Sequence, residues 1–301
     1  MSLRIFRLER MTATHGPGLR TAVFLKGCPM ACRWCAYPEG IHQRVQVLWD
    51  GALCMGCERC IAVCDENALT SENGQIRLAP RLCNVCRKCV GVCPVRALHS
   101  VGTDYTIDEL LPMLLRDRPF FGRSGGVTLT GGEPLLQGEA AALLSRLKRE
   151  SVHTAVETCG MLFPQQLEQA LPFTDLLIFD LKLADDRAHR LVTGQGVSLI
   201  RRNLALAAER MRDHGTLILR TPLIPGVTDT AENIRAIGGL LRAVKTVPRW
   251  ELVRFDDTCR QKYADMGLAF PFPHDAETDF DTLLAAARAA SDITDIRLVR
   301  I

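Results

Sequence analysis

The residues best suited to chemistry in this sequence are three closely spaced cysteines. Cys28, Cys32 and Cys35 lie in the stretch "GCPMACRWC", separated by three residues and then by two. Thiolates at such short spacings are typical metal ligands, but a structural zinc site and a ferredoxin cluster each usually take four protein ligands. The stretch therefore predicts a metal site with one ligand position unassigned.

Two longer cysteine runs follow. Residues 54–64 read "CMGCERCIAVC" and residues 83–93 read "CNVCRKCVGVC", and Pro94 follows the second run where Asp65 follows the first. In two-cluster ferredoxins, three cysteines of each such run hold one 4Fe–4S cluster and the fourth crosses to the other cluster. Two structural zinc sites are the alternative, although longer loops normally separate zinc ligand pairs. The expected ligand sets are Cys54, Cys57, Cys60 and Cys93 for one cluster and Cys83, Cys86, Cys89 and Cys64 for the other.

Composition limits the classes of partner. Among 301 residues, 37 Lys and Arg nearly balance 34 Asp and Glu, and no basic block suggests nucleic-acid binding. The N-terminal stretch is charged throughout, so it predicts no signal peptide, and no apolar run approaches the ~18 residues of a membrane span. Eleven of the 13 cysteines fall between positions 28 and 93, a clustering that favours metal ligation over disulfides. We expect a cytoplasmic protein with no membrane or nucleic-acid partner.

The elements that must position these cysteines alternate between strands and helices. A buried strand, "RTAVFLK" at 20–26, precedes Cys28, and a cysteine-rich segment interrupts the pattern before it resumes. Such alternation predicts an α/β fold with a parallel sheet, either open or curled into a partial barrel. Further strands are expected at 125–130, 152–157, 175–181, 216–221 and 250–255, with a last one within 295–301, and helices at 136–149, 164–171, 197–213, 230–245 and 276–291.

Unusual polar motifs occur where these strands end. In parallel sheets the chemistry lies on the loops at the carboxyl edge of the strands, so these motifs predict one shared site. A plain surface ion pair is the alternative for the aspartate and lysine of "DLK". The motifs are "GGEP" at 131–134, "ETCG" at 157–160, "DLK" at 180–182, "RTPLIPG" at 220–226 and "RFDD" at 254–257.

With its C-x3-C-x2-C motif followed by "GGEP", the chain resembles the radical S-adenosylmethionine (radical SAM) enzymes over nearly its whole length. The resemblance implies a partial (β/α)6 TIM-like barrel in which Cys28, Cys32 and Cys35 hold a 4Fe–4S cluster. The open iron of that cluster would bind the amino and carboxylate groups of S-adenosylmethionine, which is then cleaved to a 5′-deoxyadenosyl radical. The cosubstrate is therefore the expected fourth ligand.

Within that superfamily the chain is similar to the activating enzymes of glycyl radical enzymes, of the pyruvate formate-lyase activating enzyme type with a double ferredoxin insert. The motifs that carry this similarity include "HGPGLRTAVFLKGCPMACRWC", "YPEG", "RTPLIPGVTD" and "KYADMG". The implied organisation is a first part of the radical SAM core at 1–48, a ferredoxin-like insert at 49–100 and the remaining core at 101–301.

The resemblance also implies roles for individual residues. Trp34 would lie near the adenine, and Gly131, Gly132 and Glu133 would meet the cosubstrate's amino group. Glu157 would help to hold a monovalent cation beside the cosubstrate carboxylate. The expected cavity residues, and the candidates for catalysis, are Asp180, Lys182 and Arg220, with Asp256 as a further cosubstrate contact.

Three departures from the family pattern lie outside the cluster ligands. His15 replaces the usual Asp before "GPG", Ala36 and Tyr37 replace the usual His-Asn, and Asp256 stands where a histidine is expected. Buried Cys159 and Cys259 are expected to be small apolar residues rather than ligands.

The expected function is abstraction of hydrogen from a glycine of a partner glycyl radical enzyme under anaerobic conditions. The expected electron donor is a flavodoxin or ferredoxin. We expect three 4Fe–4S clusters and a monomer. One alternative is a radical SAM enzyme that acts on a small molecule or on another maturation target. Another is a simple electron carrier, which would leave "GGEP" and "CRWC" without a purpose.

Overall fold

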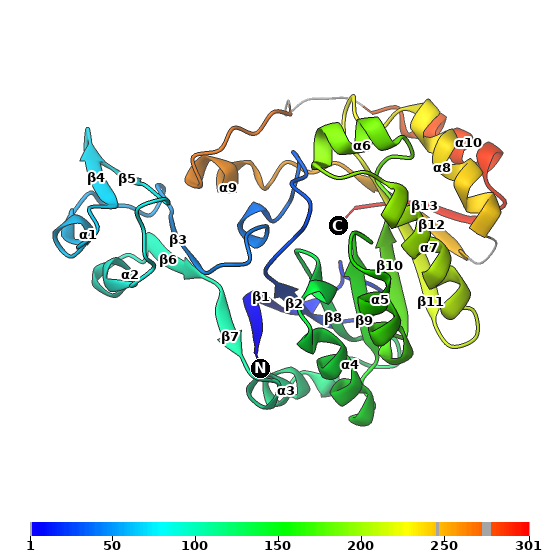
Figure 1. The fold of residues 1–301 in the computed structure, drawn as a ribbon, viewed down its shortest axis with the longest axis horizontal. Coiled ribbons are helices and arrows are strands. Elements are labelled where there is room, and N and C mark those ends of the chain that lie inside the picture. Colours follow the sequence, from blue (N-terminus) through cyan, green and yellow to red (C-terminus); the bar gives the residue numbers. More distant parts are fainter. Residues whose placement is uncertain (1, 245–246, 273–277, 301) are drawn as a thin grey trace.

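The centre of the molecule is one nine-stranded sheet. The computed structural model describes residues 2–244, 247–272 and 278–300, and the strand order is β13-β12-β11-β10-β9-β8-β2-β1-β7. Seven neighbouring strands from β2 to β13 run parallel, whereas β1 pairs antiparallel with both β2 and β7 (Figure 1). The strands are β1 Leu3–Thr12, β2 Arg20–Leu25, β7 Thr103–Tyr105, β8 Gly126–Gly131, β9 Thr154–Thr158, β10 Leu176–Asp180, β11 Thr216–Leu223, β12 Arg249–Arg254 and β13 Asp295–Val299.

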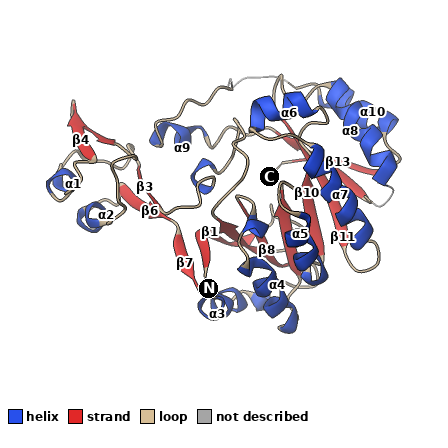
Figure 2. Cartoon of the chain, in the orientation of Figure 1, coloured by secondary structure: helices blue, strands red, loops and turns tan. Residues whose placement is uncertain are grey.

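Helices follow the strands and pack against the sheet (Figure 2). Helix α4 buries Ala140, Leu143, Leu144 and Leu147, a spacing that places all four on one helical face. The core helices are α3 Ile107–Leu115, α4 Glu139–Arg149, α5 Pro164–Ala170, α6 Asp186–Thr193, α7 Ser198–Arg210, α8 Ala231–Val244 and α10 Phe280–Ala290, with short 3-10 turns η2 Arg118–Phe120, η3 Pro134–Leu136 and η4 Leu171–Phe173.

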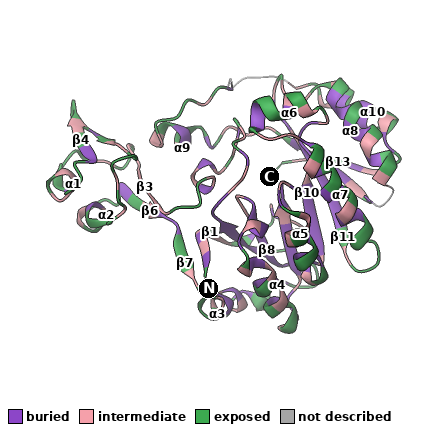
Figure 3. Ribbon diagram, viewed as in Figure 1, coloured by how far each residue is buried: buried purple, intermediate pink, exposed green. Residues whose placement is uncertain are grey.

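Alternation along the strands separates an apolar face from a polar one. In β11, Leu217 and Leu219 join the core beneath the helices, whereas Arg220 points to the opposite face. Both faces are largely buried, as the coloured strands of Figure 3 show. We call the face away from the helices the inner face, and it carries the charged side chains of the site.

Every strand expected from the sequence is present in the sheet, and the expected helices are present with shifted ends. The helix expected at 276–291 begins at Phe280 in the structure, and residues 276–277, 245 and 301 of the expected elements lie outside the described part. Four elements of the core were missed, namely β1, β7, α3 and α6. Strand β1 reads as a charged segment, yet its Leu3 and Ile5 are buried, and α6 is too short and polar to show a clear apolar period.

The cysteine-rich segment forms a separate unit beside the core, at the left of Figure 1. Strands β3 (Gln46–Trp49) and β6 (Leu98–Val101) pair antiparallel and connect this unit to the core. The paired strands begin three residues before the expected start at 49 and end one residue after the expected end at 100. The unit also contains α1 Arg59–Ala62, α2 Lys88–Val92 and the hairpin of β4 Leu69–Glu72 and β5 Gln75–Leu78.

A small apolar cluster of Val47, Leu69, Ile76 and Leu98 lies inside this unit, together with Cys60 and Cys89. The remaining elements are η1 Pro38–Gly40 and α9 Arg260–Asp265, which lies between the unit and the core in Figure 1. In the described ranges no helix has the length and apolar character needed to cross a membrane.

Candidate active site

The loop after β2 carries the three cysteines, and backbone hydrogen bonds fix it on both sides. The Cys28 N–H donates to the Ile41 carbonyl at 2.9 Å, and the Ala31 N–H donates to the Thr193 carbonyl, at the end of α6, at 2.8 Å. Burial raises the pKa of the Cys32 thiol to about 11, and burial and the neighbouring Cys32 thiol raise that of Cys35 further. The Cys32 and Cys35 thiols would thus stay protonated at neutral pH without a metal, whereas a hydrogen bond from Cys159 lowers the pKa of Cys28. Thiols gathered in this way suit a metal cluster, whose positive charge stabilises the thiolate form.

The "GGEP" loop packs directly on the cysteine loop. The Glu133 N–H donates to the Gly27 carbonyl at 2.7 Å, and a Cβ at Gly132 would lie 2.3 Å from that same oxygen. Gly131 has a φ of +108°, a conformation that side chains disfavour. Two glycines are therefore required for the two loops to meet.

The Glu133 side chain is fully buried and faces the end of β9. Its carboxylate accepts hydrogen bonds from the Thr158 hydroxyl at 2.7 Å and from the Cys159 N–H at 2.9 Å. Burial raises the pKa of this carboxyl, although the hydrogen bonds oppose that shift. The Glu133 side chain thus joins the ends of β8 and β9.

Asp180 and Lys182 form an ion pair at the end of β10, with 2.6 Å between Lys182 Nζ and Asp180 Oδ2. Only 7% of Lys182 is exposed, so the alternative of a plain surface pair does not describe it. Burial lowers the pKa of Lys182, but Asp180 and the Cys32 thiol outweigh burial and leave it raised. The structure therefore brings a buried ammonium group next to the cysteine loop.

Glu157 is the centre of a charged network on the inner face. Its Oε1 accepts a hydrogen bond from Arg220 Nη1 at 2.7 Å, and its Oε2 accepts from His15 Nδ1–H at 2.8 Å and from the Thr130 hydroxyl at 2.7 Å. Arg220 Nε also donates to Glu251 Oε2 at 2.7 Å. Although burial raises the pKa of Glu157, the neighbouring His15, Arg220 and Thr130 lower it to about 2. Sequence reasoning missed Glu251, which looks like an ordinary strand residue.

The adenine candidate Trp34 is buried in an apolar pocket with Leu183, Val192 and Ile224. Phe272 meets the Trp34 ring at a centroid distance of 6.2 Å, and Phe270 stacks on Phe255 at 6.3 Å. Phe255 lies within the "RFDD" motif, but Phe270 and Phe272 were not among the residues expected at the site. Their signal is the dense "FPF" stretch that follows "KYADMG".

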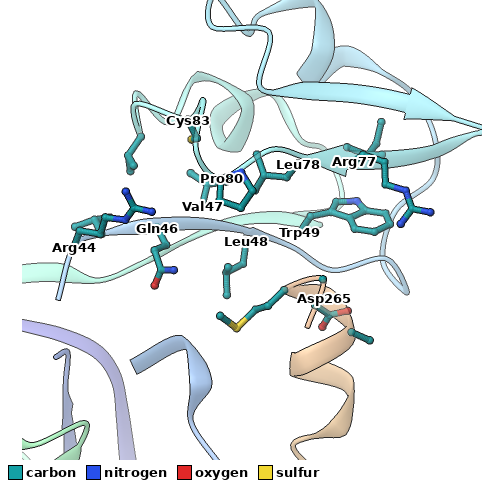
Figure 4. Close-up of a pocket in the computed structure, with 16 residues that line it drawn as sticks. Arg44, Gln46, Val47, Leu48, Trp49, Arg77, Leu78, Pro80, Cys83 and Asp265 are labelled. Atoms are coloured by element: carbon teal, nitrogen blue, oxygen red, sulfur yellow. The ribbon is translucent and has the colours of Figure 1, made fainter. Parts of the chain in front are cut away.

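Helix α9 holds the cysteine loop from the side of the insert. The Tyr263 hydroxyl donates to the Cys35 carbonyl at 3.1 Å, and Lys262 Nζ pairs with Glu39 Oε1 at 2.7 Å. A cavity of about 140 Å³ separates the tip of α9 from β3 and β5, with Trp49, Leu78 and Cys83 on one side and Asp265 on the other (Figure 4). This helix thus contacts the cysteine loop and faces the cysteine-rich unit.

Asp256 is apart from the other expected site residues. Its carboxylate accepts a hydrogen bond from the Thr258 N–H at 2.7 Å and lies 3.9 Å from the Arg300 guanidinium. These contacts give Asp256 a role in its own loop rather than in the charged network of the inner face.

The eight cysteines of the insert divide between two cavities. One cavity is lined by Cys54, Cys57, Cys60 and Cys93, and the other by Cys64, Cys83, Cys86 and Cys89. Thus the last cysteine of each run lies with the first three of the other run. Over the described residues, no group of three or more His, Cys, Asp or Glu side chains converges as the ligands of one metal ion would. A cubane cluster binds each thiolate on a different iron, so it does not require that convergence.

Comparison with known proteins places the chain among iron–sulfur enzymes. The model of the Radical SAM superfamily matches residues 81–236. The isethionate sulfite-lyase activating enzyme of Oleidesulfovibrio alaskensis is 37% identical over 96% of each chain, and the choline trimethylamine-lyase activating enzyme of the same organism is 36% identical over 94% of each chain. A radical SAM methyltransferase from Sphaerobacter thermophilus shares the fold, with a TM-score of 0.50 and 15% identity over 93% of this chain and 66% of the other.

The fold and the site thus define an enzyme of the radical SAM superfamily, whose members use a 4Fe–4S cluster and S-adenosylmethionine. The full-length similarity narrows the class, and the chain belongs to the glycyl radical enzyme activating enzymes.

Proposed function

We propose that this enzyme generates a 5′-deoxyadenosyl radical and uses it to remove a hydrogen atom from a glycine α-carbon of a partner glycyl radical enzyme. The arrangement of Cys28, Cys32 and Cys35 against "GGEP" and "DLK" carries the proposal, because it places three thiols beside groups suited to an amino acid. The similarity to activating enzymes over almost the whole chain supports it.

Residues of three strand ends would hold the cosubstrate. The cluster bound by Cys28, Cys32 and Cys35 would supply one electron to the sulfonium of S-adenosylmethionine. Backbone carbonyls of Gly131 and Gly132 suit the amino group, because the Glu133 carboxylate is occupied by Thr158 and Cys159. Trp34 and its apolar neighbours suit the adenine.

The insert is proposed to hold two further 4Fe–4S clusters, which gives three in all. The division of its cysteines between two cavities supports the ferredoxin-like assignment. A low-potential flavodoxin or ferredoxin would be the electron donor, and an anaerobic cytoplasm would suit this chemistry.

The role of the insert can be tested by removing exposed ligands from each of its sites. A Cys57→Ala, Cys86→Ala double variant should still bind S-adenosylmethionine, because the loop that carries Cys28, Cys32 and Cys35 lies outside the insert. Its turnover with a flavodoxin donor should be slow, and dithionite should restore part of the rate. Loss of S-adenosylmethionine binding as complete as in Cys32→Ala would contradict this division of labour.

The residues of this site do not identify the partner enzyme. The relatives carry the names of several different lyase, dehydratase and decarboxylase partners, at similar identity to this chain. We propose that a loop of the partner carries the target glycine to the inner face, beside Asp180, Lys182 and Arg220. A monomer of this chain would leave that face open to the partner.

Electron paramagnetic resonance of the reduced enzyme, mixed with S-adenosylmethionine and a glycyl radical enzyme encoded beside it, tests this proposal. The expected result is a glycyl doublet that disappears when the target glycine is changed to alanine. Abundant 5′-deoxyadenosine with no radical on any such partner would overturn the proposal and favour a small-molecule substrate.

A further inference from the structure

Protein groups fill three of the about four hydrogen-bonding positions of the Glu157 carboxylate. Arg220 Nη1 donates to one oxygen at 2.7 Å, while His15 Nδ1–H and the Thr130 hydroxyl donate to the other at 2.8 and 2.7 Å. Only 16% of the Glu157 side chain is exposed, and the His15 and Arg220 side chains are less than a tenth exposed. The three donors are therefore built into the fold and are not held loosely at its surface.

This arrangement is a poor site for an alkali-metal ion. A hard cation binds several oxygen atoms with free lone pairs and is repelled by neighbouring positive charge. The guanidinium of Arg220 is always charged, and it already bridges the carboxylates of Glu157 and Glu251.

The next oxygen along β9 is also engaged. The Thr158 hydroxyl donates to Glu133 Oε2 at 2.7 Å and accepts a hydrogen bond from the Gly160 N–H at 2.9 Å. The Thr158 hydroxyl is therefore engaged by the protein, as both oxygens of the Glu157 carboxylate are.

His15 is the residue that distinguishes this site from one rich in oxygen ligands. An aspartate at this position, as the family resemblance leads one to expect, would present oxygen atoms where the His15 ring presents an N–H to Glu157. The ring also packs edge-on against Phe24 at a centroid distance of 5.2 Å, which fixes its direction.

We propose that His15, together with Arg220, takes the place of a bound monovalent cation at Glu157, so that this enzyme binds S-adenosylmethionine without an alkali-metal ion. The inference rests on the proposed function for the identity of the cosubstrate. It is an alternative to the expectation that Glu157 helps to hold such a cation.

The test is a count of bound ions. Cluster-loaded, oxidised protein is equilibrated with saturating S-adenosylmethionine and rubidium chloride, separated from free salt, and analysed by mass spectrometry for rubidium. Wild-type protein should retain essentially no rubidium, whereas His15→Asp should retain about one ion per chain, because an added carboxylate completes an oxygen site. Replacing potassium by choline should leave the S-adenosylmethionine dissociation constant of the wild type unchanged and should raise that of His15→Asp about fivefold or more.

His214→Asp is the matched control. It makes the same change of charge at an exposed position just before β11, at the opposite edge of the sheet, and should behave as wild type. Rubidium bound to the wild-type protein at about one ion per chain, or a wild-type affinity that needs potassium, would overturn the inference. A His15→Asp variant that remains free of rubidium would overturn the role assigned to His15.

The ion count is independent of the partner enzyme. Failure to form a glycyl radical would therefore count against the proposed function and leave the ion count as it stands. Should His15→Asp fail to fold, the rubidium content of the wild-type protein still decides the inference.

Discussion

Individual charges in this protein differ in effect according to whether they are buried. The Asp117 side chain is 3% exposed, and it accepts hydrogen bonds from Arg10 of β1 and from the Thr21 hydroxyl of β2. Asp104 forms a similar pair with Arg4 at 2.8 Å, but its side chain is 44% exposed. Arginine and aspartate thus make the same kind of contact in two places that differ in how far the aspartate is exposed to water.

Replacing Asp117 with Asn should lower the free energy of unfolding by about 1–2 kcal/mol, since water around the exposed Arg10 weakens the pair but the Thr21 contact is buried. Asp104→Asn, the control, should cost less than about 1 kcal/mol. The thermal midpoint of each variant, measured anaerobically with clusters loaded, gives the comparison. Equal shifts for the two variants would contradict the role of burial.

Lys182 is expected to matter for the geometry of hydrogen abstraction. Lys182→Ala leaves the Asp180 carboxylate without its partner beside the Cys32 loop, so the glycine should be misplaced relative to the adenosyl group. We expect glycyl radical yield to fall about tenfold or more, with a smaller loss of uncoupled 5′-deoxyadenosine. Lys148→Ala removes a comparable 2.6 Å pair with Asp175 at the surface and should change neither product. Equal losses of both products in Lys182→Ala would show that the residue acts on cleavage alone.

At the level of elements, the cysteine loop depends on neighbours from distant parts of the chain. The carbonyl of Thr193 at the end of α6 holds its middle, the Gly27 carbonyl joins it to the "GGEP" loop, and Tyr263 of α9 holds the Cys35 carbonyl. A loop of three ligands has little structure of its own. Its shape is therefore set by the elements that surround it.

Removing one of these supports should loosen the cosubstrate site. Tyr263→Phe loses the hydrogen bond to the Cys35 carbonyl but keeps the ring, so the S-adenosylmethionine dissociation constant should rise about two- to tenfold. Gln261→Ala, on the same helix, loses only the 2.9 Å contact with Asp265 and should bind normally. Equilibrium dialysis of the oxidised enzyme measures both constants. Unchanged affinity in Tyr263→Phe would mean that the loop is fixed without α9.

The molecule as a whole combines a parallel-sheet core with a small unit that contains most of the cysteines. That unit has few large apolar side chains, so bound clusters would provide much of its folding free energy. The core, by contrast, buries an extensive set of leucines, valines and isoleucines beneath its helices. The two parts should therefore respond differently to loss of iron.

Anaerobically reconstituted protein should carry about twelve irons per chain, because each of three cubane clusters holds four. The triple variant Cys28→Ala, Cys32→Ala, Cys35→Ala should keep about eight, bound in the insert. Colorimetric iron and sulfide analysis with protein quantitation makes the measurement. Full iron retention in the triple variant, or zinc in the wild type, would contradict the assignment.

The sequence alone was sufficient to predict the features that depend on residues close together in the chain. The cysteine runs, the strand–helix alternation and the polar motifs at the strand ends are local patterns, because ligand spacing, side-chain period and turn chemistry act over a few residues. They were enough to predict a largely parallel sheet and the family to which the chain belongs.

Only the tertiary structure decided which of these groups meet. His15 reaches Glu157 across 142 positions and Tyr263 reaches Cys35 across 228, and the Glu133 carboxylate is bound by Thr158 and Cys159 at the end of β9. Short sequence patterns do not predict such contacts. Strand pairing brings these residues together, because the inner face is formed by strands that are far apart in the chain. Whether a carboxylate binds an ion, a cosubstrate or its own protein depends on the free space and the donors around it, and these exist only once the sheet has formed.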